Sequence, residues 1–217
     1  MKVVTFGDSW AAGHGLGVGE KNFTDFLSSS LNCKNKNFGV SGASLGHILH
    51  DFTTKIKHIN EGDLVVVITP PDVRWYTESS GERGRSFSTI RIGDKDYKNF
   101  VKDKSKYWFR YHHSLFIYTM YSICKDIKCN YIFAHNYGSL DIINPFSGLI
   151  LSESFLNRSE SLTSLLGGSD YNNYYLQHDG PPIPLIGENF LDNDTHPNEK
   201  GHEMIANLLL KKYYEKL

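Results

Sequence analysis

An uninterrupted apolar run from Leu64 to Ile68 constrains the fold of this chain more than any other feature. Gly62-Asp63 precede the run and Pro70-Pro71 follow it, so its length is that of a buried strand. A second short run, from Lys2 to Phe6, is rich in β-branched residues and stops at Gly7. The remaining predicted strands cover residues 37–40 and 131–134.

Segments with apolar residues at helical spacing alternate with these strands, at residues 23–31, 45–56, 115–124 and from 198 toward the C-terminus. Strands that alternate with helices favour parallel βαβ units. We therefore expect one α/β domain over residues 1–217, a three-layer α/β/α, flavodoxin-like arrangement with a short parallel sheet. Irregular excursions are expected at about 72–111 and 136–190. In such sheets, sites form beyond the carboxyl ends of the strands.

Composition excludes several classes of function. The formal net charge is -1, which gives no reason to expect nucleic acid or an anionic membrane as a partner. Three scattered cysteines, without a C-x-x-C pair, predict neither a disulfide framework nor a zinc ribbon. No apolar segment resembles a signal peptide or a membrane span, so a cytoplasmic protein is expected. The frequent Lys and Asn residues hint at a phage or AT-rich bacterial genome.

A serine follows the first predicted strand directly, in Gly7-Asp8-Ser9-Trp10. A serine at this place presents its hydroxyl over the sheet edge, next to a glycine that permits a tight turn. The first N–H groups of the following turn or helix are suited to hold a developing oxyanion. Taken alone, however, a serine after a strand is more often a helix cap or a turn residue than a nucleophile.

A histidine with acidic neighbours stands near the other end of the chain. His196 precedes Pro197, and Asp194 lies two residues before it. Histidine is the usual base for a serine nucleophile, and a carboxylate fixes the tautomer of that base. Pro197 favours the first turn of a helix, so His196 is expected at a loop-to-helix junction.

Together, the strand followed by G-D-S and the segment D-T-H-P-N-E-K-G-H resemble the SGNH/GDSL hydrolase family over nearly the whole chain. The resemblance implies Ser9 as nucleophile and Asp194 and His196 as acid and base. The segment N-F-G-V-S-G, residues 37–42, is similar to the family's second motif, which implies Gly42 as an oxyanion donor beside the N–H of Ser9. No metal and no organic cofactor is implied.

Two departures from the family pattern leave alternatives open. Many members carry G-x-N-D after the third strand, whereas this chain reads I-T-P-P-D-V-R-W from Ile68, without glycine or asparagine. Thr69, Arg74 and Asn136 are the candidates to contact substrate in place of that asparagine. Many members also place the acid three residues before the histidine, where this chain has Asn193. Asp194 is preferred, with Asp192 as the alternative.

Other patterns are given a structural interpretation. The glycines at 13, 15, 17 and 19 do not fit G-x-G-x-x-G, so they indicate a loop beside the nucleophile, in which His14 is an exposed residue. Asp194, His196 and His202 offer metal-ligand atoms but fit a loop-to-helix entry better. Aromatic residues are interpreted as cover for the sheet rim rather than as a platform for sugars: Trp75, Tyr76, Tyr107, Trp108, Tyr171, Tyr174 and Tyr175.

The sequence thus predicts a serine esterase that acts on a small-molecule or glycan ester, most plausibly an O-acetyl group on a carbohydrate. Two alternatives remain from the sequence. One is a carbohydrate-binding or structural module of the same fold with weak turnover, which the missing asparagine would permit. The other is an O-acyltransferase, in which a sugar hydroxyl takes the place of water. The oligomeric state is not predicted.

Overall fold

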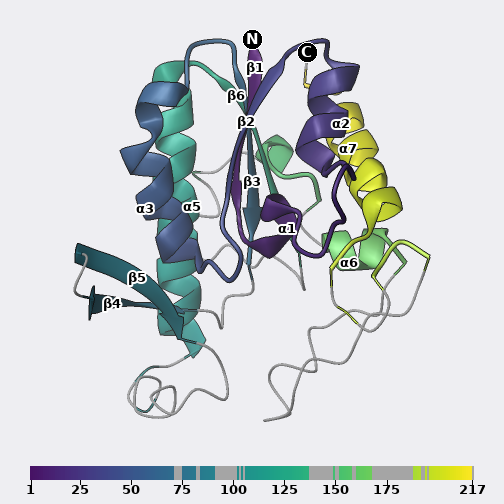
Figure 1. Ribbon diagram of the computed structural model, residues 1–217. Helices are drawn as coiled ribbons and strands as arrows, with labels where there is room; N and C mark the ends of the chain where they lie inside the picture. The colour runs from purple at the N-terminus through teal and green to yellow at the C-terminus, as the bar shows by residue number, and fades with distance from the viewer. Residues whose placement is uncertain are drawn as a thin grey trace.

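A four-stranded parallel sheet forms the centre of the molecule, in the order β2-β1-β3-β6 (Figure 1). We describe it from a computed structural model over residues 1–70, 75–81, 84–90, 102, 104, 106–136, 149, 152–157, 160–167, 188–191, 194 and 196–216. The strands are β1 (Lys2–Gly7), β2 (Lys34–Gly39), β3 (Leu64–Thr69) and β6 (Asn130–His135). The four predicted strands are confirmed, although β2 begins three residues earlier than expected.

The two central strands are buried on both faces because helices cover the sheet on each side. Every residue of β3 is buried. Alternate residues of β1 point to opposite layers, with Val3 in one core cluster and Val4 and Phe6 in the other. The parallel register pairs Gly7 with Gly39 and with Ile68, so the strands end together at one edge.

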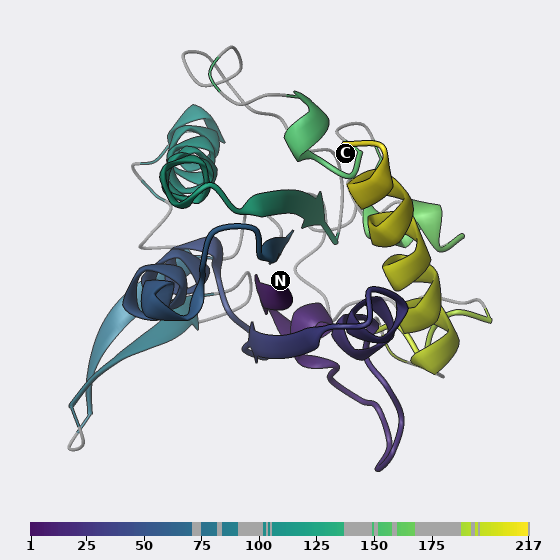
Figure 2. The same cartoon turned by 90° about the horizontal axis from the view of Figure 1, so that it is seen from above.

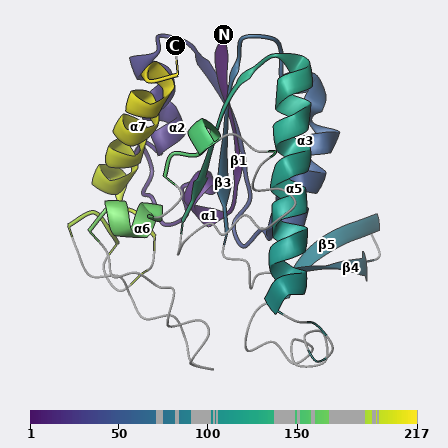
Figure 3. The same ribbon diagram turned by 180° about the vertical axis from the view of Figure 1, so that it is seen from behind.

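Two helix pairs form the outer layers. Helices α2 (Phe23–Ser30) and α7 (Glu199–Tyr214) pack on one face, and α3 (Leu45–Thr54) and α5 (Lys106–Ile127) pack on the other. Figure 2 shows the sheet between these pairs, and Figure 3 shows the same layers from behind. The predicted three-layer α/β/α fold is confirmed.

The first predicted excursion contains regular structure that sequence reasoning missed. Strands β4 (Trp75–Gly81) and β5 (Gly84–Ile90) form an antiparallel hairpin, and α5 begins at Lys106 rather than near Leu115. The second excursion includes the short helices η3 (Ser152–Ser154) and α6 (Leu162–Leu165), while residues 137–148 and 168–187 lie outside the described part. The short helix η1 (Ile56–His58) follows α3.

The carboxyl edge of the sheet, at the bottom of Figure 1, is where the first and last motifs meet. A short helix, α1 (Ser9–Ala12), follows β1 directly at this edge. Both chain termini lie at the opposite end of the molecule (Figure 1). Among the described residues, no helix combines the length and the apolar character needed to cross a membrane.

Candidate active site

Ser9 is the first residue of α1, at the point where β1 ends. Asp8 caps this helix: its carboxylate accepts the N–H of Trp10, and its carbonyl accepts the N–H of Ala12 at 2.9 Å. Gly13 ends the helix with φ +74°, a left-handed conformation that glycine adopts without strain. One turn of helix therefore fixes Ser9, whose residue is only 7% exposed.

The residue before Ser9, Asp8, carries a fully buried carboxylate. Asp8 is 0% exposed, and its second oxygen accepts a 2.8 Å hydrogen bond from Nδ2 of Asn136, which follows β6. Asn136 is held in turn, because its carbonyl accepts both the N–H and the hydroxyl of Thr163. A buried charge is costly unless it is hydrogen-bonded, so this contact ties the Ser9 turn to the end of β6.

His196 is carried by a closed loop at the start of α7. The N–H of Leu191 donates to the carbonyl of His196 at 2.9 Å, and the N–H of Asn198 donates to the carbonyl of Asn189 at 3.0 Å. Asn198 also caps α7 through Oδ1, while its Nδ2 donates to the carbonyls of Glu188 and Phe190. This one asparagine thus joins the histidine loop to the helix.

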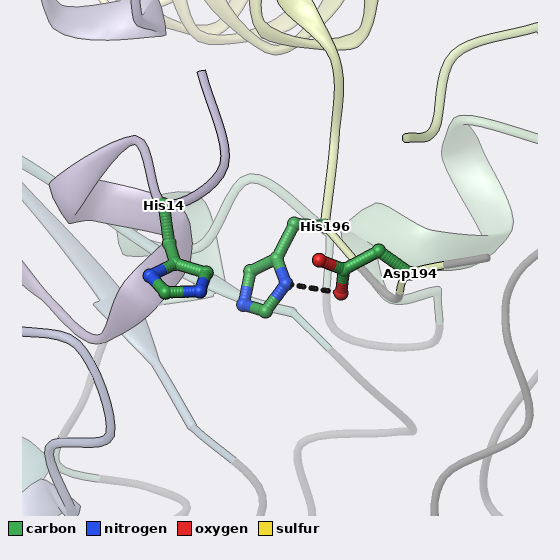
Figure 4. A group of neighbouring side chains, drawn as sticks. All are labelled: His14, Asp194 and His196. Atoms are coloured by element: carbon green, nitrogen blue, oxygen red, sulfur yellow. Dashed lines mark hydrogen bonds and ion pairs between the residues drawn. The ribbon is translucent and has the colours of Figure 1, made fainter. Parts of the chain in front are cut away.

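The two ends of the chain meet at a line of three side chains. His196 Nε2 lies 2.8 Å from Ser9 Oγ, and His196 Nδ1 lies 2.6 Å from Asp194 Oδ1 (Figure 4). With a proton on Nδ1, the imidazole donates to Asp194 and accepts the hydroxyl proton of Ser9 on Nε2. The side chain of His196 is 16% exposed and that of Asp194 is 37% exposed, so the serine side of the line is the buried one.

The N-F-G-V-S-G segment holds α1 from the neighbouring strand. Nδ2 of Asn37 donates to the carbonyl of Ala11 at 2.6 Å, and the N–H of Val40 donates to the carbonyl of Gly7 at 2.9 Å. A Cβ on Gly39 would collide with the backbone of Ala11 and Ala12, so only glycine permits this close approach. Gly42 follows, with φ +80°, in the loop that enters α3.

The other predicted site residues differ in whether the structure brings them to the turn that holds Ser9. Thr69 is fully buried, and its hydroxyl donates to the carbonyl of Ala134 at 3.3 Å, so it bridges the ends of β3 and β6. Asn136 directs its amide to Asp8, as described above. Arg74 and Asp192 lie outside the described residues. Thus Asn136 contacts the turn that holds Ser9, whereas the hydroxyl of Thr69 is used in a bond within the sheet.

His202 lies on the first turns of α7 and is buried away from solvent. Its Nδ1 accepts the N–H of Phe23 at 3.4 Å, and its ring stacks on that of Phe23. Burial, together with the nearby His196, lowers the pKa of His202 to about 4. This histidine therefore stays neutral at physiological pH and packs α7 against α2.

His14 is exposed, as expected for the loop beside Ser9. Its contact with His196 was not predicted: the two rings lie against each other, with centroids 4.7 Å apart (Figure 4). The N–H of His14 donates to the carbonyl of Ser9 at 2.9 Å. The signal was the short spacing: a residue five positions after Ser9, just past a one-turn helix, cannot travel far from it.

The aromatic residues of the sequence analysis are only partly described. Tyr107 is 60% exposed at the start of α5, and the ring of Trp108 contacts that of His112, with centroids 4.0 Å apart. The Tyr171, Tyr174 and Tyr175 cluster lies outside the described residues. Exposure of Tyr107 differs from the burial expected of a residue that covers the sheet rim.

No family model matches the chain, and no curated protein sequence matches it significantly. Solved structures do match. A G-D-S-L family lipolytic protein from Desulfitobacterium hafniense DCB-2 has a TM-score of 0.56 at 13% identity, covering 97% of this chain and 98% of that one. LAE5, an α/β hydrolase enzyme from the Lake Arreo metagenome, has a TM-score of 0.55 at 15% identity, with coverages of 98% and 94%.

A mutant of Axe2, an acetyl-xylooligosaccharide esterase from Geobacillus Stearmophilus, has a TM-score of 0.50 at 14% identity, with coverages of 98% and 93%. Each similarity covers nearly the whole of both chains, so it concerns the arrangement of the sheet and the helices as a whole. Over nearly its whole length, the chain has the fold of the G-D-S-L, or SGNH, hydrolases.

Proposed function

We propose that this protein is a serine esterase in which Ser9 is the nucleophile, His196 the general base and Asp194 the residue that orients it. The observation that carries the proposal is the unbroken line from Ser9 Oγ to His196 Nε2 at 2.8 Å and from His196 Nδ1 to Asp194 Oδ1 at 2.6 Å. Both distances suit proton transfer and tautomer fixation.

The reaction has two halves. Ser9 Oγ attacks the carbonyl carbon of the ester while His196 Nε2 takes the hydroxyl proton, and the proton then passes to the leaving alcohol. Water next attacks the acyl-serine while the same nitrogen takes a proton from it, and His196 then returns this proton to Ser9 Oγ as the acid leaves. The chain's own groups supply the nucleophile, the base and the orienting carboxylate.

The developing oxyanion requires donors at the carboxyl edge of the sheet. We assign this role to the N–H of Ser9, which opens α1 where N–H groups have no partner within the helix, and to the N–H of Gly42. Among the described residues, Asn136 is the side-chain candidate for a further donor, because one hydrogen of its Nδ2 is used by Asp8 and the amide carries a second, while Arg74 stays a prediction.

For the substrate, we propose an O-acetyl group on a carbohydrate. The likeness to an acetyl-xylooligosaccharide esterase supports this class, and the exposed Tyr107 at the start of α5 offers a ring face of the kind that packs on sugars.

Hydrolysis of p-nitrophenyl acetate and of acetylated xylo-oligosaccharides tests both levels of the proposal. The variant S9A should lose nearly all turnover of either ester, whereas S29A, which alters an exposed serine on α2, should match the wild type. Equal turnover by S9A and wild type would contradict the role of Ser9 as nucleophile. Turnover of the nitrophenyl ester without deacetylation of the oligosaccharides would overturn only the substrate class.

A further inference from the structure

One group of side chains at the site has a property that ester hydrolysis does not require. His14, Asp194 and His196 each offer a metal-ligand atom, and these three atoms lie within 4.8 Å of one another. Figure 4 shows the ring of His14 on the side of His196 opposite Asp194, facing the ring nitrogen that Asp194 does not bind. That nitrogen is Nε2, the one that contacts Ser9.

We propose that a divalent transition-metal ion, with Zn²⁺ as the reference ion, binds between His14 and His196 Nε2 and switches the nucleophile off. Zn²⁺ favours neutral imidazole nitrogens at about 2.0–2.1 Å in tetrahedral geometry, which sets neighbouring ligand atoms about 3.3 Å apart. Since the cluster offers one ligand atom from each side chain within 4.8 Å of the others, side-chain shifts of about 1.5 Å would bring two such atoms to this spacing.

Asp194 already occupies the place that such a site needs. A histidine that binds zinc usually donates its other ring N–H to a carboxylate, which fixes the ring and strengthens the nitrogen as a ligand. The Nδ1-to-Oδ1 contact of 2.6 Å is that arrangement. The same carboxylate also brings a negative charge close to the bound cation.

His14 is suited to close the site from the solvent side. It is exposed, and besides its contact with His196 its ring meets only an exposed partner, Ser41 Oγ, at 3.3 Å from Nδ1 in the described part of the chain. Its backbone is fixed, because Gly13 ends α1 and the N–H of His14 donates to Ser9. An ion can therefore enter from solvent, and a small ring rotation is enough to bind it.

Inhibition follows from competition for one lone pair. His196 Nε2 accepts the proton of Ser9 during attack, and a metal ion on that nitrogen leaves no base for the hydroxyl. This consequence depends on the proposed esterase function, whereas binding of the ion does not. His202, considered from the sequence as a third ligand, does not take part, since its Nδ1 accepts the N–H of Phe23.

Calorimetric titration of ZnCl₂ into the S9A protein, at pH 7.5 with a non-thiol reductant, tests binding without any reaction. We expect one ion per chain. Replacing His14 by Gln in the same background should weaken binding at least about 10-fold, because a direct ligand is worth no less than the outer-shell partners of zinc. H50Q, which alters an exposed histidine on α3, is the matched control and should bind as its parent does.

A second arm follows hydrolysis of p-nitrophenyl acetate against Zn²⁺, each variant relative to its own rate with EDTA. Wild type and H50Q should be inhibited and recover with EDTA, and H14Q should need at least about 10-fold more Zn²⁺. No binding by S9A, or equal binding by S9A and its H14Q form, would overturn the metal site. Zinc binding by a protein without esterase activity would leave the site standing and overturn the proposed function instead.

Discussion

Ser9 Oγ and His196 Nε2 lie 2.8 Å apart, and the proposed chemistry depends on which ring nitrogen of His196 carries the proton. Asp194 decides this, because its carboxylate accepts from Nδ1 and leaves the lone pair of Nε2 directed at the serine. The acid stands two residues before the base rather than three. The N–H of Leu191 donates to the carbonyl of His196, and this bond closes a short loop in which Asp194 reaches His196 from two residues away.

The variant D194N tests the role of this carboxylate. An amide in the same place no longer holds the Nδ1–H tautomer or stabilises the imidazolium, so kcat/KM for p-nitrophenyl acetate should fall roughly 10³- to 10⁴-fold. D126N changes an exposed acid on α5 and serves as the control, with unchanged rates. If D194N keeps wild-type activity, another acid, with Asp192 the first candidate, orients the base.

Asn136 is expected to matter for stability as well as for rate. The variant N136A leaves the buried carboxylate of Asp8 without the donor that lies 2.8 Å from it. A buried acceptor that loses its partner costs about 1–3 kcal/mol, and more when it is charged. Urea unfolding should show a lower midpoint, and turnover should fall because Asp8 caps the helix that begins at Ser9. An unchanged midpoint would show that the Asp8 contact does not stabilise the turn.

At the scale of elements, the histidine loop and α7 act as one unit through Asn198. Substitution by alanine removes the helix cap, worth about 1 kcal/mol, together with the two donors to Glu188 and Phe190. Substitution by serine keeps a capping oxygen and removes only the donors. Thermal unfolding should therefore rank wild type above N198S and N198S above N198A.

Activity separates the two roles of Asn198 further. If the two donors of Nδ2 position His196, N198S should already lose turnover, although it retains the cap. A rate for N198S equal to that of wild type, with a loss only in N198A, would show that capping of α7 is what matters and that the loop holds its shape without Nδ2.

The elements also show what the sequence made predictable. Strands β1 and β3 are apolar runs with clear stops, and the terminal motifs fix the ends that meet at the site. The hairpin was missed because Trp75–Gly81 and Gly84–Ile90 carry few aliphatic residues, although their separation by two residues is a hairpin signal. The short spacing from Ser9 predicts that His14 lies near the site, but its ring contact with His196 depends also on the left-handed turn at Gly13 and on the loop that carries His196.

At the scale of the whole molecule, the proposed catalytic arrangement needs the N-terminal and C-terminal segments to be docked. Ser9 and His196 are separated by 187 positions in sequence, yet their side chains lie 2.8 Å apart. The docking is made by α2 against α7, where His202 is buried on Phe23, and by Glu199 accepting the N–H of Lys21 at 3.0 Å. Trp10, next to the nucleophile, packs on Phe190 beside the histidine loop, so the same contacts serve folding and chemistry.

Acid should weaken this docking through His202. Burial lowers its pKa from 6.5 to about 4, so between these values the unfolded chain binds a proton that the folded chain does not. Stability is therefore complete above about pH 6.5 and declines as the pH falls toward 4, by up to about 3 kcal/mol. H202N keeps an acceptor for Phe23 without a titrating ring. Urea midpoints at pH 7.5 and pH 5 should differ less for H202N than for wild type, and equal differences would contradict the assignment.

The central claim is that Ser9, activated by His196, is the nucleophile of this protein. Reaction with a fluorophosphonate, followed by intact mass and peptide mapping, tests it without assuming a substrate. The wild type should gain one adduct, on Ser9, while S9A should gain none and H196Q should react far more slowly. An adduct on another residue, or labelling of S9A at the wild-type rate, would contradict the account.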